Sequence, residues 1–275
     1  MMERVRLSNG VELHYERAGR GTPLVFIHGA MGDWRSWEAQ WPAFTAGYDC
    51  ITYSRRYSFP NRNDMPSPDH SALHEAEDLR LMLDALDVER AILVGSSYGG
   101  FTALALAVSQ PQRVRALVAV EPPMMRYAEL SEAGRTARAA FRRETIEPAN
   151  AAFRGGDDEL AGRIMTGGIN GAQAPASSPQ QMQRRLQNLR AMRMLALSTD
   201  EFPLLAPAQL AALPMPVMLL SGESTAPIHR EIFANLAEAM PQATVLRVPG
   251  AGHGVSREQP GFFNERVLDF LKRVA

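Results

Sequence analysis

The residues best suited to chemistry lie at positions 95–100, which read Gly-Ser-Ser-Tyr-Gly-Gly and match the pattern G-x-S-x-G around Ser97. The pattern directly follows the apolar run Ala91–Val94 and opens an apolar, helix-forming segment. A strand that turns this sharply into a helix exposes the central hydroxyl, and the helix N-terminus behind it stabilises developing negative charge. The sequence therefore predicts that Ser97 is a nucleophile, whereas the neighbouring Ser96 lacks the symmetric glycines.

A serine hydroxyl becomes nucleophilic when a base removes its proton, and His253 is the best candidate for that base. It lies in a glycine-rich loop, residues 250–254, directly after a predicted strand, so its imidazole can reach back over the end of a sheet. Two other histidines have different expected roles. His28 is expected to shape its loop by hydrogen bonding, and His229 to lie near the substrate pocket.

Together with the serine motif at 95–100, three motifs in this order resemble the α/β-hydrolase superfamily: Phe-Ile-His-Gly-Ala at 26–30, Gln-Pro-Gln-Arg-Val at 110–114, and Val-Pro-Gly-Ala-Gly-His at 248–253. The resemblance spans nearly the whole chain, and it is highly specific for the fold but much less so for the substrate. It implies a mostly parallel eight-stranded sheet flanked by helices, with a helical cap insertion, and a catalytic histidine within the third motif. It also implies an oxyanion hole made by the backbone N–H groups of Ala30 and Tyr98.

The acid that would orient the histidine departs from the family's usual position. Most members carry an Asp three residues after the glycine that ends the next-to-last strand, and Thr225 stands there instead. Glu121 closes the predicted strand 114–120, so its carboxylate should emerge beside Ser97 at the same sheet edge. Haloalkane dehalogenases and zearalenone-type lactonases take their acid from that strand end, and Glu121 resembles the acid of those members. We expect Glu121 to be the triad acid, with Glu223 as the alternative.

The rest of the sequence supplies the elements that must position these groups. Short apolar runs of strand length alternate with helical segments, which predicts a mostly parallel sheet covered on both faces. Strands are expected at residues 4–7, 11–15, 24–27, 50–53, 91–94, 114–120, 217–220 and 243–248. Helices are expected at residues 70–86, 101–108, 228–240 and 262–274. Residues 124–213 break the alternation and predict a helical cap, which leaves 1–123 and 214–275 as the hydrolase core domain.

The substrate pocket is expected beneath this cap. Methionine side chains adapt to irregular apolar shapes, so cap methionines that face Ser97 would favour a bulky apolar substrate. The candidate pocket residues are Met31, Trp34, Met125, Met192 and His229. Arg55 and Arg56 could bind a substrate carboxylate, but pairing with acidic residues of the protein is the preferred interpretation.

Composition excludes several other classes of protein. The chain has 275 residues, with 29 Lys and Arg against 30 Asp and Glu, so its charge gives no reason to expect a nucleic acid partner. A single cysteine, Cys50, excludes an internal disulfide. Neither a secretory leader nor a membrane-spanning apolar run is apparent, so a cytoplasmic protein that contacts no membrane is expected.

No cofactor is expected either. His70 and His74 lie four residues apart, but no third metal ligand accompanies them, and a solvated helix face is the preferred interpretation. No glycine-rich phosphate-binding loop occurs in the sequence. The expected partner is a small-molecule ester or lactone, and the sequence leaves a homodimer open.

These features predict a serine hydrolase that cleaves a carboxylic ester or lactone of an apolar small molecule through an acyl-enzyme. A serine at the nucleophile position argues against haloalkane dehalogenases and epoxide hydrolases of this fold, which use an Asp there. Two alternatives stay open. One is a C–C bond hydrolase of the ring-cleavage type, and the other is a ligand receptor that keeps the triad but has negligible turnover.

Overall fold

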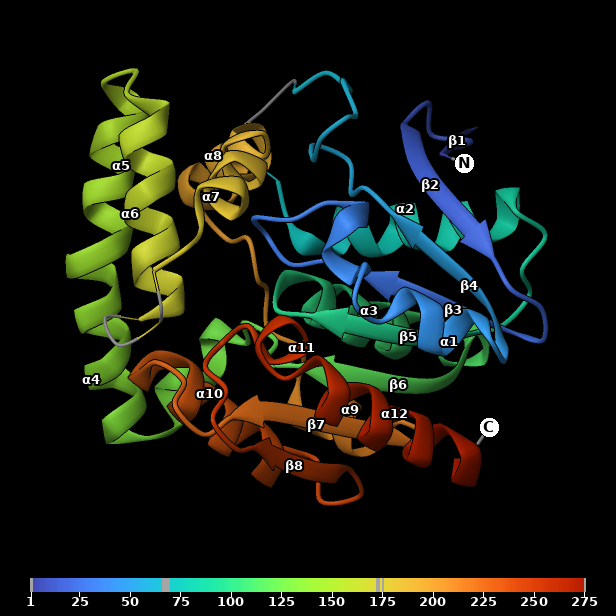
Figure 1. The fold of residues 1–275 in the computed structure, drawn as a ribbon. Coiled ribbons are helices and arrows are strands. Elements are labelled where there is room, and N and C mark those ends of the chain that lie inside the picture. Colours follow the sequence, from blue (N-terminus) through green and yellow to red (C-terminus); the bar gives the residue numbers. More distant parts are fainter. Residues whose placement is uncertain (1, 66–69, 172–173, 175, 275) are drawn as a thin grey trace.

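A single twisted sheet runs through the centre of the molecule (Figure 1). The computed structural model describes residues 2–65, 70–171, 174 and 176–274. Within these residues the sheet has eight strands in the order β1-β2-β4-β3-β5-β6-β7-β8. The strands are β1 Glu3–Arg6, β2 Glu12–Ala18, β3 Thr22–Ile27, β4 Tyr48–Tyr53, β5 Ala91–Ser96, β6 Val114–Val120, β7 Val217–Gly222 and β8 Thr244–Val248. Only the pairings of β2 with β1 and β4 are antiparallel among these strands, which confirms the expected mostly parallel sheet.

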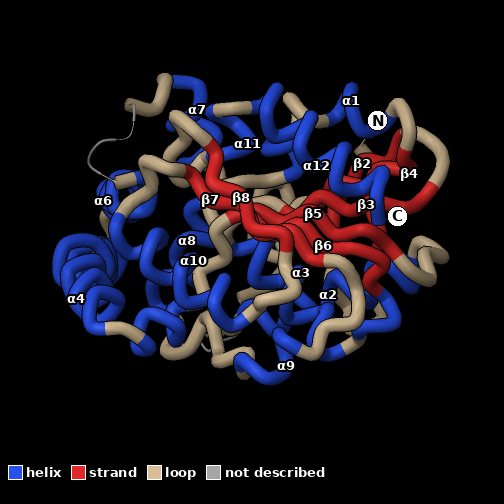
Figure 2. Tube along the Cα trace, turned by 90° about the horizontal axis from the view of Figure 1, so that it is seen from below, coloured by secondary structure: helices blue, strands red, loops and turns tan. Residues whose placement is uncertain are grey.

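Helices cover both faces of this sheet (Figure 2). One face carries α1 Trp41–Thr45, α11 Val255–Glu258 and α12 Pro260–Val274. The other face carries α2 Ala72–Ala85, α3 Tyr98–Ser109, α9 Pro207–Ala211 and α10 Pro227–Ala239. Because successive strand residues point to opposite faces, Leu24 and Phe26 of β3 join one buried apolar cluster and Val25 and Ile27 join the other. Because these strands are buried on both faces, their sequences are continuous apolar runs.

The segment between β6 and β7 is helical, and it lies at the end of the sheet where β5 and β6 end (Figure 1). Its helices before α9 are α4 Glu132–Phe141, α5 Glu147–Arg154, α6 Asp158–Asn170, α7 Pro179–Leu186 and α8 Leu189–Leu197. The helices α5, α6 and α8 enclose a small apolar cluster of their own, around Phe153, Met165 and Met192. The last helix, α9, instead packs onto the main core through Leu210. The division into a core and a cap at residues 124–213 stays a prediction.

All four helices expected from the sequence begin one to three residues away from the predicted start, at Ala72, Tyr98, Pro227 and Pro260. The helix expected from residue 70 starts at Ala72, because the Ser71 hydroxyl accepts a hydrogen bond from the Leu73 N–H and caps it. The helix expected from residue 101 starts at Tyr98, directly after Ser97. In the part of the chain that the structure describes, no helix is long and apolar enough to cross a membrane.

The turn from β5 into α3 depends on two glycines. Ser97 itself has a positive φ of 51°, a conformation that costs free energy for a residue with a side chain. A Cβ atom on Gly95 would lie 2.2 Å from the Gly99 carbonyl oxygen, and one on Gly99 would lie 2.1 Å from the Ile27 carbonyl oxygen. The chain therefore reverses here only because no side chain is present at either position.

We expect Gly95→Ala to lower the free energy of unfolding by about 3 kcal/mol or more, because the added methyl group collides with backbone rather than with a flexible side chain. The measurement is chemical denaturation followed by circular dichroism. Gly167→Ala in α6 is the matched control, since a Cβ atom there meets nothing within 4 Å. It should stabilise the protein by up to about 1 kcal/mol. Equal stability of the two variants would contradict the role of the turn.

Candidate active site

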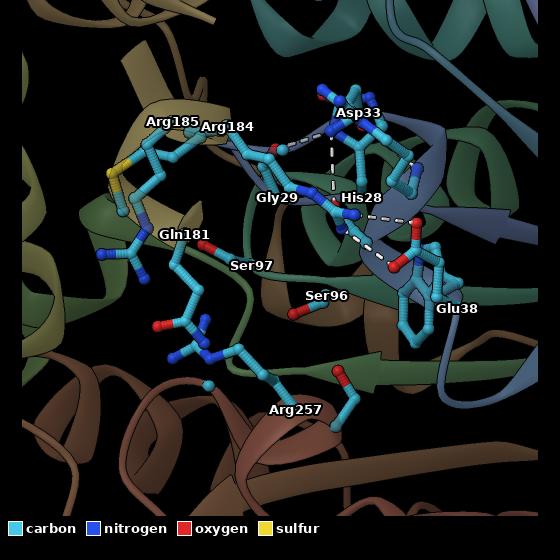
Figure 3. A pocket seen from close by; sticks show the side chains of 18 of the residues that line it. His28, Gly29, Asp33, Glu38, Ser96, Ser97, Gln181, Arg184, Arg185 and Arg257 are labelled. Atoms are coloured by element: carbon cyan, nitrogen blue, oxygen red, sulfur yellow. Dashed lines mark hydrogen bonds and ion pairs between the residues drawn. The ribbon is translucent and has the colours of Figure 1, made fainter. Parts of the chain in front are cut away.

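Ser97 and His253 line the same cavity, which has a volume of about 420 Å³ and opens between the ends of the parallel strands and the helices α6 and α7 (Figure 3). Ser97 stands at the sharp turn after β5, and His253 stands in the loop between β8 and α11. No hydrogen bond joins their side chains in the described part of the chain, and the buried Nε2 of His253 has no partner there. Such a bond is often long before substrate binds and tightens in the complex.

The other ring nitrogen of His253 contacts Glu121. The distance from His253 Nδ1 to Glu121 Oε2 is 2.6 Å, and both side chains are buried, with exposed fractions of 7% and 1%. Because Nδ1–H donates to the carboxylate, the neutral ring presents an unprotonated Nε2. The structure therefore brings together the three side chains that the sequence singled out, in the order serine, histidine and acid.

Glu121 is held by a cage of donors from the end of β7. Its Oε1 accepts hydrogen bonds from the Ser221 hydroxyl and the Gly222 N–H, both at 2.8 Å. Its Oε2 accepts a third, at 2.7 Å, from the hydroxyl of Thr225, the residue at the position where most of the superfamily carries an Asp. The backbone of Glu121 has a positive φ of 40°, which swings the side chain across to β7. Thr225 thus helps to hold the Glu121 carboxylate in place.

These contacts keep the Glu121 carboxylate charged. Burial alone would raise the pKa of this carboxyl group, but the hydrogen bonds that His253 and Thr225 donate lower it below the ordinary value of 4.5. The alternative acid, Glu223, is solvent-exposed, and its backbone N–H bonds to the Val248 carbonyl oxygen. Of the two candidates, Glu121 is the one beside the histidine.

His229 lies against His253 rather than in the cavity. The two rings stack with centroids 4.0 Å apart and planes 20° apart, and His229 Nε2–H donates to the Ile169 carbonyl oxygen of α6 at 2.9 Å. Burial, together with the neighbouring His253 ring, lowers the pKa of His229 to about 3, so this ring is neutral. It therefore supports the face of His253 without adding a charge.

Glu121, His229 and His253 each offer a metal-ligating atom, and these atoms lie within 4.8 Å of one another. A ring nitrogen binds a metal ion in the plane of its ring. Two rings stacked face to face direct their lone pairs in parallel, so they cannot converge on one ion without rotating away from Glu121 and Ile169. The arrangement favours hydrogen bonding over metal binding.

Opposite the histidine, the loop after β3 is fixed by His28. Its Nδ1–H donates to the Gly29 carbonyl oxygen at 2.8 Å, and its Nε2 accepts the Arg55 N–H at 2.9 Å. Burial lowers the pKa of His28 to about 3, which fits a neutral ring that donates on one side and accepts on the other. The N–H groups of Ala30 and Tyr98 make no hydrogen bond within the described residues. They remain available to a substrate oxygen, as an oxyanion hole requires.

A buried ion pair supports this loop from behind. Arg55 donates to Glu75 at 2.9 Å with both side chains almost fully buried, and its guanidinium lies 3.7 Å from the centre of the Tyr98 ring. Although burial raises the pKa of Glu75, the charge of Arg55 and the hydrogen bond from His70 outweigh it and bring the pKa to about 2. Arg56 pairs with Asp78 at 2.6 Å. Both arginines thus bind acidic residues of the protein, as the preferred interpretation predicted.

Most of the expected pocket residues lie elsewhere. Met31 lines the cavity, whereas Trp34, Met125, Met192 and His229 are not among the side chains that line it. Trp34 stacks on the ring of Phe59, and Met192 is fully buried among the cap helices. Met125 packs against the main core. The sequence could not distinguish a methionine that is buried among helices from one that lines a cavity.

The cavity is more polar than expected, and the sequence analysis missed the groups that make it so. Asn170 of α6 lines it. Gln181 and Arg185 of α7 and Arg257 of α11 line it as well (Figure 3). The one available signal was the position of Arg257, four residues after the predicted base. The expectation of an apolar pocket therefore gains no support from the lining.

Comparisons with known proteins span nearly the whole chain. A sequence model of the Alpha/beta hydrolase family matches residues 24–266. The chain is 28% identical to the 2-hydroxy-6-oxononadienedioate/2-hydroxy-6-oxononatrienedioate hydrolase of Paraburkholderia xenovorans (strain LB400), over 97% of this chain and 94% of that protein. It is also 28% identical to the sn-1-specific diacylglycerol lipase ABHD11 of Mus musculus, over 90% of this chain and 80% of that protein.

The fold is shared with solved structures as well. One described as "Est816 as an N-Acyl homoserine lactone degrading enzyme" superposes with a TM-score of 0.76 and 24% identity, covering 98% of this chain and 100% of that chain. Together these similarities support the fold and the broad chemistry, while the names of the three proteins concern different substrates.

The ion pair behind the loop makes stability depend on pH. We expect Glu75→Gln to cost about 3–5 kcal/mol at pH 7, because it leaves the Arg55 charge buried without a counter-ion. The folded pKa of Glu75, about 2, is below its ordinary value of 4.5, so the contribution is present above pH 4.5 and is lost as the pH falls toward 2. Urea denaturation should therefore show a smaller difference in the free energy of unfolding between wild type and Glu75→Gln at pH 3 than at pH 7.

Glu77→Gln on the same helix is the control. Glu77 pairs with Arg80 at the surface, where such pairs contribute about 1 kcal/mol or less. Two results would contradict a stabilising ion pair between Arg55 and Glu75. One is a loss of unfolding free energy in Glu75→Gln that is the same at both pH values, and the other is a loss no larger than that of Glu77→Gln.

Proposed function

Because the chain belongs to the alpha/beta hydrolase family, we propose that it is a serine hydrolase that cleaves a carboxylic ester or lactone through an acyl-enzyme. The observation that carries this proposal is the 2.6 Å contact between His253 Nδ1 and Glu121 Oε2 beside the cavity that Ser97 lines. An acid and a base held in this way serve to activate a hydroxyl nucleophile.

In the proposed mechanism, the Ser97 hydroxyl attacks the carbonyl carbon while His253 Nε2 takes its proton. Glu121 keeps the proton of His253 on Nδ1 and stabilises the imidazolium that forms. The N–H groups of Ala30 and Tyr98 stabilise the negative charge on the carbonyl oxygen. His253 then protonates the departing alkoxide. A water molecule, deprotonated by His253, releases the acid and restores Ser97.

The position of the acid favours lactones among the substrates of this chemistry. An acid at the end of the strand after the nucleophile strand resembles the arrangement of zearalenone-type lactonases. The similar solved structure is described as degrading N-acyl homoserine lactones, although that likeness concerns the fold alone. In a lactone the departing alkoxide stays attached to the acyl group, so the product is a single hydroxy acid.

Hydrolysis of a carbon–carbon bond is the second candidate. The relative from Paraburkholderia xenovorans that is 28% identical over nearly the full length is named as a hydrolase of oxo-dienedioates, which are dicarboxylates. A substrate panel that contains simple aryl esters, lactones and a vinylogous 1,5-diketone distinguishes these activities. Multiple turnover on any of them would exclude a receptor that only binds its ligand.

We expect Ser97→Ala to lower kcat by about 10⁴-fold or more on every substrate of that panel that wild type turns over, because no other hydroxyl takes its place. The fold should survive, as measured by circular dichroism and thermal unfolding. The assignment of the nucleophile would be wrong if Ser96→Ala abolished turnover and Ser97→Ala did not.

We expect Glu121→Gln to lower kcat by up to about 10⁴-fold, because the amide keeps the shape but can bind the wrong tautomer of His253. Glu223→Gln is the matched control and should lose little, since that side chain is exposed at the surface. Steady-state kinetics on one aryl ester measures both variants. A strong loss in Glu223→Gln with little loss in Glu121→Gln would overturn the choice of acid.

A second part of this experiment introduces an Asp at position 225, where most of the family carries its acid. Thr225→Asp alone should impair the enzyme, because it places a second carboxylate against Glu121 Oε2, which Thr225 contacts at 2.7 Å. In the Glu121→Gln background the same change removes that repulsion and should recover part of the activity. No recovery in a folded double variant would mean that β7 cannot supply the acid in this chain.

A further inference from the structure

Arg185 is a buried cation that forms no ion pair within the described residues. Its exposed fraction is 7%, and no carboxylate oxygen there lies within the 4.0 Å that defines an ion pair. Its Nη1 donates to the Ser177 hydroxyl, which is neutral. Burying a charge without a counter-ion costs several kcal/mol, so this position needs an explanation.

Other arginines of this region have their counter-ions. Arg35 pairs with Asp33 at 2.6 Å, and Arg184, the residue before Arg185, pairs with Glu38 at 2.9 Å. Arg55, which is equally buried, pairs with Glu75. The fold thus provides carboxylates to guanidinium groups around the cavity but leaves Arg185 without one.

Arg185 and Arg257 line the cavity that contains Ser97, and Figure 3 shows both side chains extending toward it from α7 and α11. Arg257 Nη2 bonds to Glu258 Oε1 at 2.9 Å, and Glu258 Oε2 also accepts the Gly252 N–H at 2.7 Å. Glu258 is therefore the counter-ion of Arg257, and it forms no ion pair with Arg185. Burial, and then the charge of Arg257, lower the pKa of Arg185 to about 10 against a smaller opposing effect of the Glu258 charge, so Arg185 stays charged at neutral pH.

We propose that Arg185, assisted by Arg257, binds a carboxylate of the substrate while the scissile carbonyl group lies at Ser97. This inference rests on the proposed hydrolase function and narrows its substrate class to acids that carry an ester or lactone group. A planar guanidinium matches a carboxylate with two parallel hydrogen bonds. The single unbalanced positive charge matches one carboxylate, whereas a phosphate monoester carries close to two negative charges at neutral pH.

The test compares p-nitrophenyl hemiesters of succinate, glutarate and adipate with p-nitrophenyl butanoate, pentanoate and hexanoate, which have the same acyl lengths but no carboxylate. Wild type should prefer the acidic ester at one or more lengths. Arg185→Gln should lower the ratio of kcat/KM for the acidic over the neutral ester by about 10- to 100-fold, mainly through KM. Arg163→Gln on α6, which removes a charge from an exposed surface pair, is the control.

Equal preference for the two ester series in wild type, or a ratio that Arg185→Gln and Arg163→Gln change to the same small extent, would overturn the proposal. A purely structural arginine would change stability without changing this ratio. Removing an unbalanced buried charge should leave the melting temperature equal or higher. Should Arg185→Gln fail to fold, Arg257→Gln serves as the second variant, with a smaller loss of the same ratio expected.

Binding of glutarate to Ser97→Ala, measured by calorimetry, separates this inference from the proposed function. Glutarate should bind to Ser97→Ala and should lose about 10-fold or more in affinity when Arg185→Gln is added. If glutarate binds through Arg185 but wild type hydrolyses no ester, only the proposed hydrolase function is wrong. Ser97-dependent hydrolysis without any binding of glutarate would overturn the carboxylate site alone.

Discussion

The contact between Glu121 and His253 is the interaction on which the rest of the site depends. A carboxylate with 2% exposure is costly unless its charge is compensated, and here four donors compensate it: His253 Nδ1–H, the Ser221 and Thr225 hydroxyls and the Gly222 N–H. Three of these donors only hold the acid in place. The fourth donor is the imidazole of His253, so the same carboxylate also orients the ring of the proposed base.

The order of the strands brings these groups together. Ser97 follows β5, Glu121 follows β6, the donors Ser221 to Thr225 end β7, and His253 follows β8. These are four consecutive neighbours in the sheet, and parallel strands present their carboxyl ends at one edge. Because β6 and β7 lie side by side, an acid can stand at the end of either strand and reach the same histidine. The positive φ of Glu121, 40°, is what directs its carboxylate toward β7.

The sequence predicted the sheet and singled out the side chains that lie at its edge, because both leave local patterns. Buried strands appear as apolar runs, the sharp turn requires glycines around Ser97, and the absence of an Asp at Thr225 points to Glu121. The lining of the cavity was not predictable in the same way. Met192 and Trp34 both have apolar surfaces to bury, and only the packing of α5, α6 and α8 decides that Met192 is enclosed by helices. In the sequence Arg185 resembles an ordinary surface arginine, and only the position of α7 over the strand ends shows otherwise.

The charges around the site depend on which buried groups have a partner that compensates for the loss of water. His28 and His229 are buried and neutral, with the pKa of each lowered to about 3, so neither disturbs the negative charge that Glu121 holds behind His253. The positive charge lies on one side of the cavity, at Arg185 of α7 and Arg257 of α11. An anionic group on a substrate is attracted to that side and repelled by Glu121 on the other. A substrate with one carboxylate and one ester or lactone group would therefore enter in a single orientation, with its carbonyl carbon directed to Ser97.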